Sequence, residues 1–344
     1  MTAVFDGHND VLGKLQAQDG APETFLTGLP DRDVDLPRAR AGGLGGAMFA
    51  INAPSPDDAW DTASLSDMPY ARAADHAEAT AFTAGALGRA HALAAASAGA
   101  VAVVTDVAAL DRRRADGTLA MVLHLEGAEA IDPGLAALDA WYAAGVRSIG
   151  LVWSRPSAFG HGVPFRFPAS PDTGPGLTDA GRALVRRCAE LGIVVDLSHL
   201  NAAGFADVAR MAAAPLVVSH TACHALCAST RNLTDDQLRD VARSDGLVGI
   251  VFCTAFLRAD GAANADMPLA TLVAHVRHAA ELAGVDRVGL GSDFDGAPMP
   301  AELSDVAALP RLLDALREDG FSADEVDAIA WGNWRRVLAA AWGA

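Results

Sequence analysis

The sequence predicts an α/β fold, specifically a closed (β/α)₈ barrel of the TIM type with extra C-terminal helices. Short apolar runs alternate along the chain with longer stretches of helical spacing, and this alternation is typical of parallel sheet. Eight such units favour a closed barrel over an open sheet. A doubly wound sheet would normally carry a glycine-rich phosphate loop after its first strand, and no such motif occurs there. The expected strands lie at 3–7, 45–51, 120–126, 147–152, 193–198, 216–220, 247–252 and 287–292.

The segments between these strands carry helix start and stop signals. In the stretch from Leu177 to Leu191, Thr178 or Asp179 can cap the N-terminus and Gly192 can end the helix. The final part, 303–344, reads as helices that pack outside the barrel. We find no internal repeat and no convincing linker, so we expect residues 1–344 to form a single domain.

Two stretches rich in Pro, Ser, Asp and Gly are expected to form long loops. They cover 53–66 and 154–176. Binding and catalytic residues are often carried by loops on a rigid scaffold. The second loop is therefore a candidate cover for an active site.

The composition excludes several classes of protein. The 344 residues are 51% hydrophobic, which is enough for a large core, and their formal net charge of −17 argues against a nucleic-acid partner. Four cysteines without a CxxC pair argue against a disulfide framework. The N-terminus lacks a secretory pattern, and no apolar run approaches the roughly 20 residues that span a bilayer. We therefore expect a cytoplasmic protein with no membrane partner.

Side chains that commonly bind metals fall at the ends of the expected strands, where barrel enzymes place their catalytic groups. Taken singly, a histidine there is more often structural, and an acidic residue is often a helix cap. As a set, three histidines, one aspartate and one glutamate supply the mixed nitrogen and oxygen ligands that suit zinc. The five candidate ligands are His8, Asp10, Glu126, His199 and His220.

A pair of metal ions would need an anionic ligand that both ions share. In some barrel hydrolases this ligand is a carbamylated lysine. The only lysine of the chain, Lys14, lies beyond the first strand and is poorly placed for that role. Glu126, at the end of the third expected strand, is then the natural bridging ligand.

With these positions in view, the sequence resembles the membrane (renal) dipeptidase family of zinc metallopeptidases, in its intracellular bacterial form. The resemblance covers nearly the whole chain, and its ordered set of motifs is highly specific. The motifs include Asp6-Gly7-His8-Asn9-Asp10, Glu126-Gly127, Val195-Asp196-Leu197-Ser198-His199, Ser219-His220-Thr221-Ala222, Arg231-Asn232 and Gly291-Ser292-Asp293-Phe294-Asp295-Gly296.

The resemblance implies two zinc ions per chain and a division of the ligands between them. His8 and Asp10 would bind one ion, His199 and His220 would bind the other, and Glu126 would bridge both.

The resemblance also implies roles outside the metal ligands. Arg231 would hold the substrate carboxylate, because its planar guanidinium suits bidentate recognition; the alternative is a salt bridge that stabilises the loop. Asp293 would shuttle the proton, or else cap a helix. Asp295 and Asn232 would support the ligands from behind.

One position departs from the family pattern. Many animal members carry a histidine at the end of the fourth strand, where it helps to polarise the substrate carbonyl, and this chain has Trp153 there. An indole offers one N–H group and a flat wall but cannot act as an imidazole. We expect Trp153 to contact the substrate. His161, in the following loop, is a candidate substitute, although an ordinary loop histidine is the simpler interpretation.

The expected function is zinc-dependent hydrolysis of dipeptides by a metal-bridged hydroxide, including dipeptides with a C-terminal D-residue. The small peptide substrate is the principal partner, and the resemblance suggests a homodimer. Three other interpretations stay open at this point. The first is a different amide hydrolase on the same metal centre, acting on β-lactams or N-acyl-D-amino acids. The second is a barrel without catalytic activity, and the third is a lyase with a single metal ion.

Overall fold

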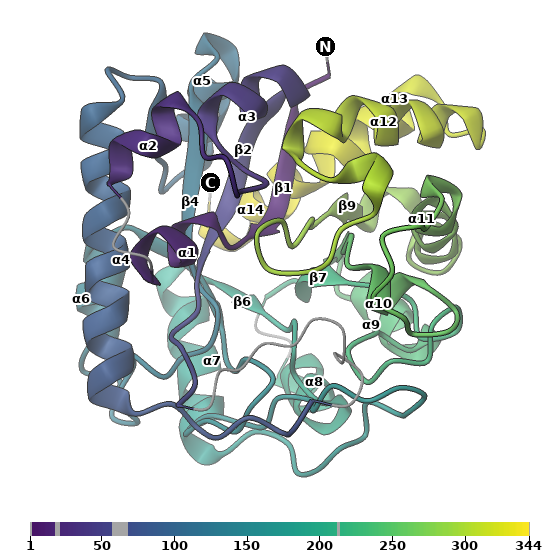
Figure 1. Ribbon diagram of the computed structural model, residues 1–344. Helices are drawn as coiled ribbons and strands as arrows, with labels where there is room; N and C mark the ends of the chain where they lie inside the picture. Colours follow the sequence, from purple (N-terminus) through teal and green to yellow (C-terminus); the bar gives the residue numbers. More distant parts are fainter. Residues whose placement is uncertain (1, 18–20, 57–67, 212–213, 344) are drawn as a thin grey trace.

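The computed structural model describes residues 2–17, 21–56, 68–211 and 214–343, and its parallel strands close into a barrel (Figure 1). The ring closes because β1 pairs in parallel with both β2 and β9, while β2 also pairs with β4. This confirms the predicted (β/α)₈ class. The eight strands of the ring are β1 (Val4–Asn9), β2 (Leu44–Ile51), β4 (Leu119–Leu125), β5 (Val146–Gly150), β6 (Val194–Asp196), β7 (Val217–Thr221), β8 (Leu247–Ile250) and β9 (Val288–Leu290).

A ninth strand, β3 (Val101–Val103), was not expected from the sequence. It pairs with the first residues of β4, from Leu119 to Met121, and β5 pairs with β4 only from Leu123 onward. The short strand therefore adds to β4 where β5 has not yet reached it. A run of three residues is too short to show a period, so the sequence pattern could not separate it from a loop.

Helices follow the strands and cover the outside of the barrel (Figure 1). The predicted caps are confirmed in α7, where the Thr178 hydroxyl accepts a hydrogen bond from Gly181 N and Gly192 ends the helix with a left-handed φ of 68°. The helices are α1 (Val11–Ala17), α2 (Pro22–Thr27), α3 (Leu36–Gly42), α4 (His76–Ala96), α5 (Val107–Asp116), α6 (Leu138–Ala143), α7 (Asp179–Leu191), α8 (Ala202–Met211), α9 (Asp235–Arg243), α10 (Thr254–Leu257), α11 (Leu269–Ala283), α12 (Leu309–Glu318), α13 (Ala323–Asp327) and α14 (Asn333–Trp342).

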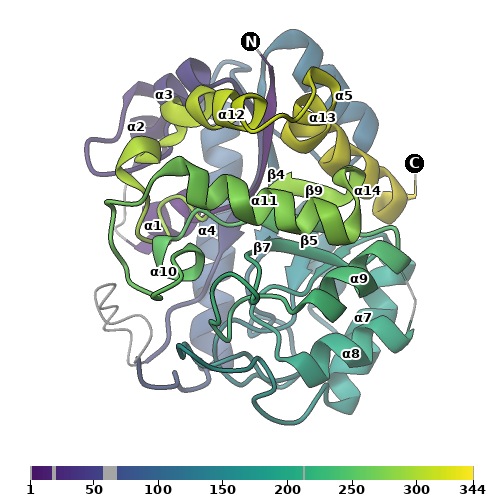
Figure 2. The same cartoon turned by 90° about the vertical axis from the view of Figure 1, so that its right-hand side faces the viewer.

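The C-terminal helices are drawn in yellow in Figure 2 and carry two buried tryptophans, Trp331 and Trp334. Trp331 and Trp334 are buried against Phe5 and other side chains from the starts of the strands. The indole of Trp334 donates a hydrogen bond to Leu290 O at 2.8 Å, and a side chain on Gly7 would collide with its ring. These contacts fill the amino end of the barrel and leave the carboxyl end for a site.

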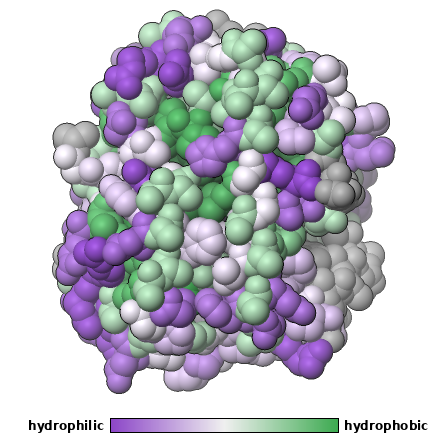
Figure 3. Space-filling view, turned by 90° about the vertical axis from the view of Figure 1, so that its left-hand side faces the viewer, coloured by the Kyte–Doolittle hydropathy of each residue, from purple (hydrophilic) through white to green (hydrophobic). Residues whose placement is uncertain are grey.

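Few large hydrophobic side chains are exposed on the part of the surface that the structure describes. On the face shown in Figure 3, hydrophilic residues gather towards the edges and less polar ones occupy the middle. Among the described residues, Tyr70 is the one large hydrophobic side chain classed as exposed, at 41%. No helix in the described ranges combines the length and the apolar character needed to cross a bilayer.

Of the two predicted long loops, the structure describes the second but only the first residues of the first. Residues 57–66 of the first predicted loop lie outside the described residues. The second loop, which follows β5, runs beside the segment after β6, because Val163 N donates to His199 O at 2.8 Å. The second loop is thereby held at the carboxyl end of the barrel.

Candidate metal centre and substrate pocket

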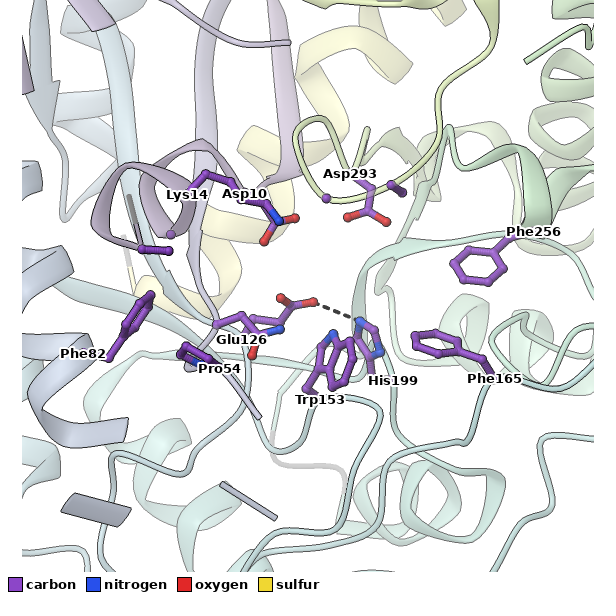
Figure 4. Close-up of a pocket in the computed structure, with 15 residues that line it drawn as sticks. Asp10, Lys14, Pro54, Phe82, Glu126, Trp153, Phe165, His199, Phe256 and Asp293 are labelled. Atoms are coloured by element: carbon purple, nitrogen blue, oxygen red, sulfur yellow. Dashed lines mark ion pairs between the residues drawn. The ribbon is translucent and has the colours of Figure 1, made fainter. Parts of the chain in front are cut away.

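The five candidate ligands come from the ends of four different strands and meet at the carboxyl end of the barrel; Figure 4 shows Asp10, Glu126 and His199 among them. Glu126, directly after β4, lies at the middle of the group. Its Oε1 atom is 2.9 Å from His199 Nε2, 3.5 Å from His220 Nε2 and 3.6 Å from His8 Nε2. Asp10 completes the group, with its Oδ2 atom 3.5 Å from His8 Nε2. The structure thus brings the five residues together, with Glu126 at the middle of the other four.

Asp293 joins this group from the segment after β9. Its Oδ1 atom lies 3.9 Å from His8 Nε2, and its backbone N–H donates to His8 O at 3.0 Å. Asp293 and His199 both have a left-handed backbone, with φ of 65° and 66°, which is uncommon for residues other than glycine. Such conformations persist where the surrounding structure imposes them, and they cluster at active sites.

Serine hydroxyls hold the two histidines on the far side of Glu126. Ser154 Oγ is hydrogen-bonded to His199 Nδ1 at 2.7 Å, and Ser219 Oγ to His220 Nδ1 at 2.8 Å. In each ring this leaves Nε2 facing Glu126. Histidine ligands commonly bind a metal through one ring nitrogen while the other is fixed by a hydrogen bond.

Two buried aspartates, Asp196 and Asp6, each bind a serine that directly precedes a site residue. Asp196 accepts hydrogen bonds from the backbone N–H and the hydroxyl of Ser219, and Asp6 does the same with Ser292. Each serine directly precedes a site residue, His220 in the first case and Asp293 in the second. The sequence analysis did not assign these four supporting residues. The recurring pair of a serine and a site residue after a strand is the signal that could have found them.

Replacing Ser219 by Ala is expected to weaken metal binding by roughly 10- to 100-fold, because the His220 ring loses the hydrogen bond that orients it. Competition with a chelator, followed by metal analysis, measures this change. Ser322→Ala is the control, since Ser322 caps the remote helix α13. An unchanged affinity in the Ser219 variant would show that its hydroxyl does not position the ligand.

The chemistry of the group fits a bound cation. Both ring nitrogens of His8 are buried without a hydrogen-bond partner among the described residues. A side chain on Gly296 would come within 2.0 Å of Asp10 Oδ2 and 2.5 Å of Asp293 Oδ1, so glycine leaves the space beside the two carboxylates open. Ligand atoms lie within 4.8 Å of one another in one set formed by His8, Glu126 and His220, and in another formed by His8, Asp10 and Asp293.

The charges of the group lead to the same conclusion. Burial raises the pKa of Glu126 to about 8 and that of Asp293 to about 7. Burial lowers the pKa of His199 and of His220 well below the usual value, which favours the neutral imidazole that binds metals. Burial also opposes protonation of His8, but Glu126, Asp10 and Asp293 together raise its pKa to about 10. The carboxylates of Glu126, Asp10 and Asp293 thus strongly favour a positive charge in the space that they surround.

A cavity of about 230 Å³ opens onto this group. It is smaller than the roughly 300–1,000 Å³ of pockets for drug-sized ligands, so its size suits a small molecule. Trp153 lines the cavity, with its ring 5.7 Å from the His199 ring; its contact with a substrate stays a prediction. Phe165 from the long loop after β5 and Phe256 line it as well, whereas His161 is not among the lining residues. The sequence analysis did not single out either phenylalanine.

Arg231 lies behind the metal-ligand group. Its Nη2 donates to His220 O at 2.9 Å, its Cζ is 5.9 Å from the centre of the Phe256 ring, and its Nε has no partner among the described residues. Asn232, next in the chain, donates to Cys227 O and Phe256 O at 2.8 Å each. Asn232 therefore fixes the turn that carries Arg231.

Asp295, predicted as a support, faces away from the ligands. Its carboxylate accepts hydrogen bonds from the backbone of Asp33 at 3.0 Å and of Val34 at 3.2 Å, and its own N–H donates to Asp33 Oδ2 at 2.9 Å. These bonds tie the segment after β9 to the segment before α3. Asp295 thereby holds the loop that carries Asp293.

The barrel and its group of histidines and carboxylates place the protein in the class of metal-dependent barrel hydrolases. The chain belongs to the membrane dipeptidase family, peptidase family M19, whose family model matches residues 1–342. This makes it a peptide-bond hydrolase of the metallopeptidase type.

Individual relatives agree with this assignment. A metallo peptidase from Rhodobacter sphaeroides, solved with a phosphinate mimic of the dipeptide L-Ala-D-Ala, is 43% identical, with 99% of each chain covered and a TM-score of 0.96. A dipeptidase designated AC, of family M19, is 43% identical with complete coverage of both chains and a TM-score of 0.95. An uncharacterised protein in the pqqA 5′ region of Klebsiella pneumoniae is 49% identical over 246 residues, 72% of this chain and 91% of that protein.

Proposed function

We propose that the protein hydrolyses dipeptides, including those with a C-terminal D-residue, at a centre of two zinc ions. The observation that carries this proposal is the position of Glu126, whose carboxylate meets histidines from three separate strand ends at 2.9 to 3.6 Å. The similarity to the Rhodobacter sphaeroides peptidase supports a dipeptide as substrate, since that protein holds an L-Ala-D-Ala mimic.

The ligands would divide between the two ions as the family resemblance implies. His8 and Asp10 would hold one ion, His199 and His220 the other, and Glu126 both. Imidazole nitrogens and carboxylate oxygens are the ligands that zinc commonly takes in catalytic sites. When bound, zinc polarises a substrate carbonyl and lowers the pKa of water to about 7.

The protein's own side chains would orient the substrate and move the proton. Arg231 holds the C-terminal carboxylate from the Phe256 side of the cavity and so limits the length of the substrate. Asp293 accepts the proton of the attacking water and delivers it to the leaving amine. Trp153 and Phe165 form apolar walls that exclude bulk water from the scissile amide.

A dipeptide library that varies both residues and their chirality tests the proposed substrate class, with N-acyl-D-amino acids and a β-lactam as the comparison panel. We expect hydrolysis of L,D-dipeptides by the zinc-loaded protein. Turnover of the acyl compounds or the β-lactam alone would contradict the dipeptide assignment.

We also propose that residues 1–344 form one domain and that the protein is a cytoplasmic homodimer. The absence of a linker and the family resemblance support these points. Light scattering of the purified chain tests the dimer.

A further inference from the structure

Lys14 has a place in the cavity that the proposed mechanism does not use. It is the only lysine in the chain and lies on α1, one helical turn after Asp10. It lines the cavity at the metal centre and also an adjoining cavity of about 290 Å³. Figure 4 shows its side chain extending beside Asp10 towards the space bounded by Glu126 and Asp293.

Lys14 is partly buried as a residue, and its ammonium group forms no ion pair among the residues that the structure describes. Its acidic neighbours have other partners. Asp33 and Asp295 bind backbone N–H groups of each other's segments, and Asp10 lies 3.5 Å from His8 Nε2. A partly desolvated cation without a partner is costly, so the group is placed to receive an anion.

Arg231 and Lys14 lie towards different sides of the cavity. Arg231 lies behind the ligands, with its Cζ 5.9 Å from the ring of Phe256, which lines the right-hand side of the cavity in Figure 4, whereas Lys14 lines the left-hand side beside Asp10. This inference rests on the proposed function, in which Arg231 holds the C-terminal carboxylate and the scissile amide faces Glu126. The N-terminal residue of a bound dipeptide then extends towards Lys14.

We propose that Lys14 selects dipeptides whose N-terminal residue carries an acidic side chain. The α-amino group of any dipeptide is a cation and would be repelled by Lys14 unless a negative charge lies between them. An aspartyl or glutamyl side chain supplies that charge. Binding of an acidic side chain needs a cation nearby, because the chain carries a net charge of −17 and its electrostatic field opposes anionic ligands.

The test compares L-Glu-D-Ala with the neutral L-Gln-D-Ala, which has nearly the same shape. We expect kcat/KM of the zinc-loaded protein to favour the glutamyl substrate by roughly 10- to 100-fold, the range for a hydrogen bond to a charged group. In Lys14→Met this ratio falls to about one, and Lys14→Arg, which keeps the charge, retains most of it. Lys14→Glu turns the preference towards L-Lys-D-Ala.

Arg112→Met is the matched control, because it removes the same charge from an exposed position on α5 and leaves the ratio unchanged. Inhibition by phosphinate mimics of the same two dipeptides gives a second readout that does not require turnover. Thermal melting of each variant shows whether it is folded.

The outcomes separate this inference from the function on which it rests. A zinc-loaded wild type that cleaves no dipeptide contradicts the proposed function. Dipeptide hydrolysis with equal kcat/KM for the glutamyl and glutaminyl substrates contradicts the role of Lys14 alone. A Lys14→Met variant that melts earlier but keeps the wild-type ratio also overturns it, because Lys14 would then serve the fold.

Discussion

Replacing Glu126 by Gln is expected to reduce kcat/KM by roughly 10²- to 10³-fold, the scale of losing one catalytic electrostatic group. The carboxylate faces three imidazoles, and the nearest Nε2 is 2.9 Å away. An amide has the same shape but no charge, and one of its two heavy atoms is a donor that cannot bind a cation. We therefore expect the variant to retain clearly less than two zinc ions per chain. Metal analysis and steady-state kinetics with added zinc measure both effects.

Glu190→Gln is the control for this experiment. Glu190 lies on α7 in an exposed ion pair with Arg187, and such pairs contribute little to stability. Its removal should leave metal content and activity unchanged. A Glu126→Gln variant that binds two zinc ions and keeps its activity would show that Glu126 is not a shared ligand and would favour a mononuclear site.

Replacing Asp293 by Asn is expected to lower kcat by roughly 10²- to 10⁴-fold, the usual contribution of a general acid–base group. Metal content should stay close to that of the wild type, because the proposed ligand set does not include Asp293. Its distance of 3.9 Å from His8 places the carboxylate beside the metal ligands. Single-turnover kinetics separates a slower chemical step from weaker substrate binding.

The pH dependence of activity provides an independent test of the same role. Burial and the charge of Asp10 raise the pKa of Asp293 to about 7, against the opposing effect of His8 and Arg231. A general base must be deprotonated, so activity rises as pH passes upward through this pKa and is lost below it. Bound cations lower that pKa, and the acid limb should therefore fall below pH 7.

The loss of activity at acidic pH that is due to Asp293 should disappear in Asp293→Asn. It should persist in Asp295→Asn, because Asp295 faces Asp33 and Val34. An unchanged acid limb in Asp293→Asn would assign the proton transfer to another group.

Much of the fold could be predicted because barrel strands are buried on both faces and read as short apolar runs. The predicted boundaries of the eight strands differ from the observed ones by at most two residues, and His8, Glu126 and His220 lie at or near the strand ends. The strand Val101–Val103 was missed because it forms only where the first residues of β4 are not yet paired with β5. This unpaired stretch depends on how the strands are aligned in the folded sheet, and the local sequence does not reveal it.

The site was predictable where residue type and strand end coincide, as they do for Glu126 and His220. The supporting residues were not predictable in the same way. Ser219 is held in place by Asp196 on the neighbouring strand, so its role depends on a register that only the folded sheet defines. Lys14 was considered solely as a bridging ligand. Its spacing of four from Asp10 on a helix could have placed the two side chains on one face.

The most direct test of the account is a zinc titration of the metal-free protein, with hydrolysis of L-Ala-D-Ala followed at each step. We expect activity to rise until two zinc ions are bound per chain, and we expect the Glu126→Gln variant not to follow this curve. Full activity at one zinc ion per chain, or activity that does not depend on metal, would contradict the proposed binuclear centre.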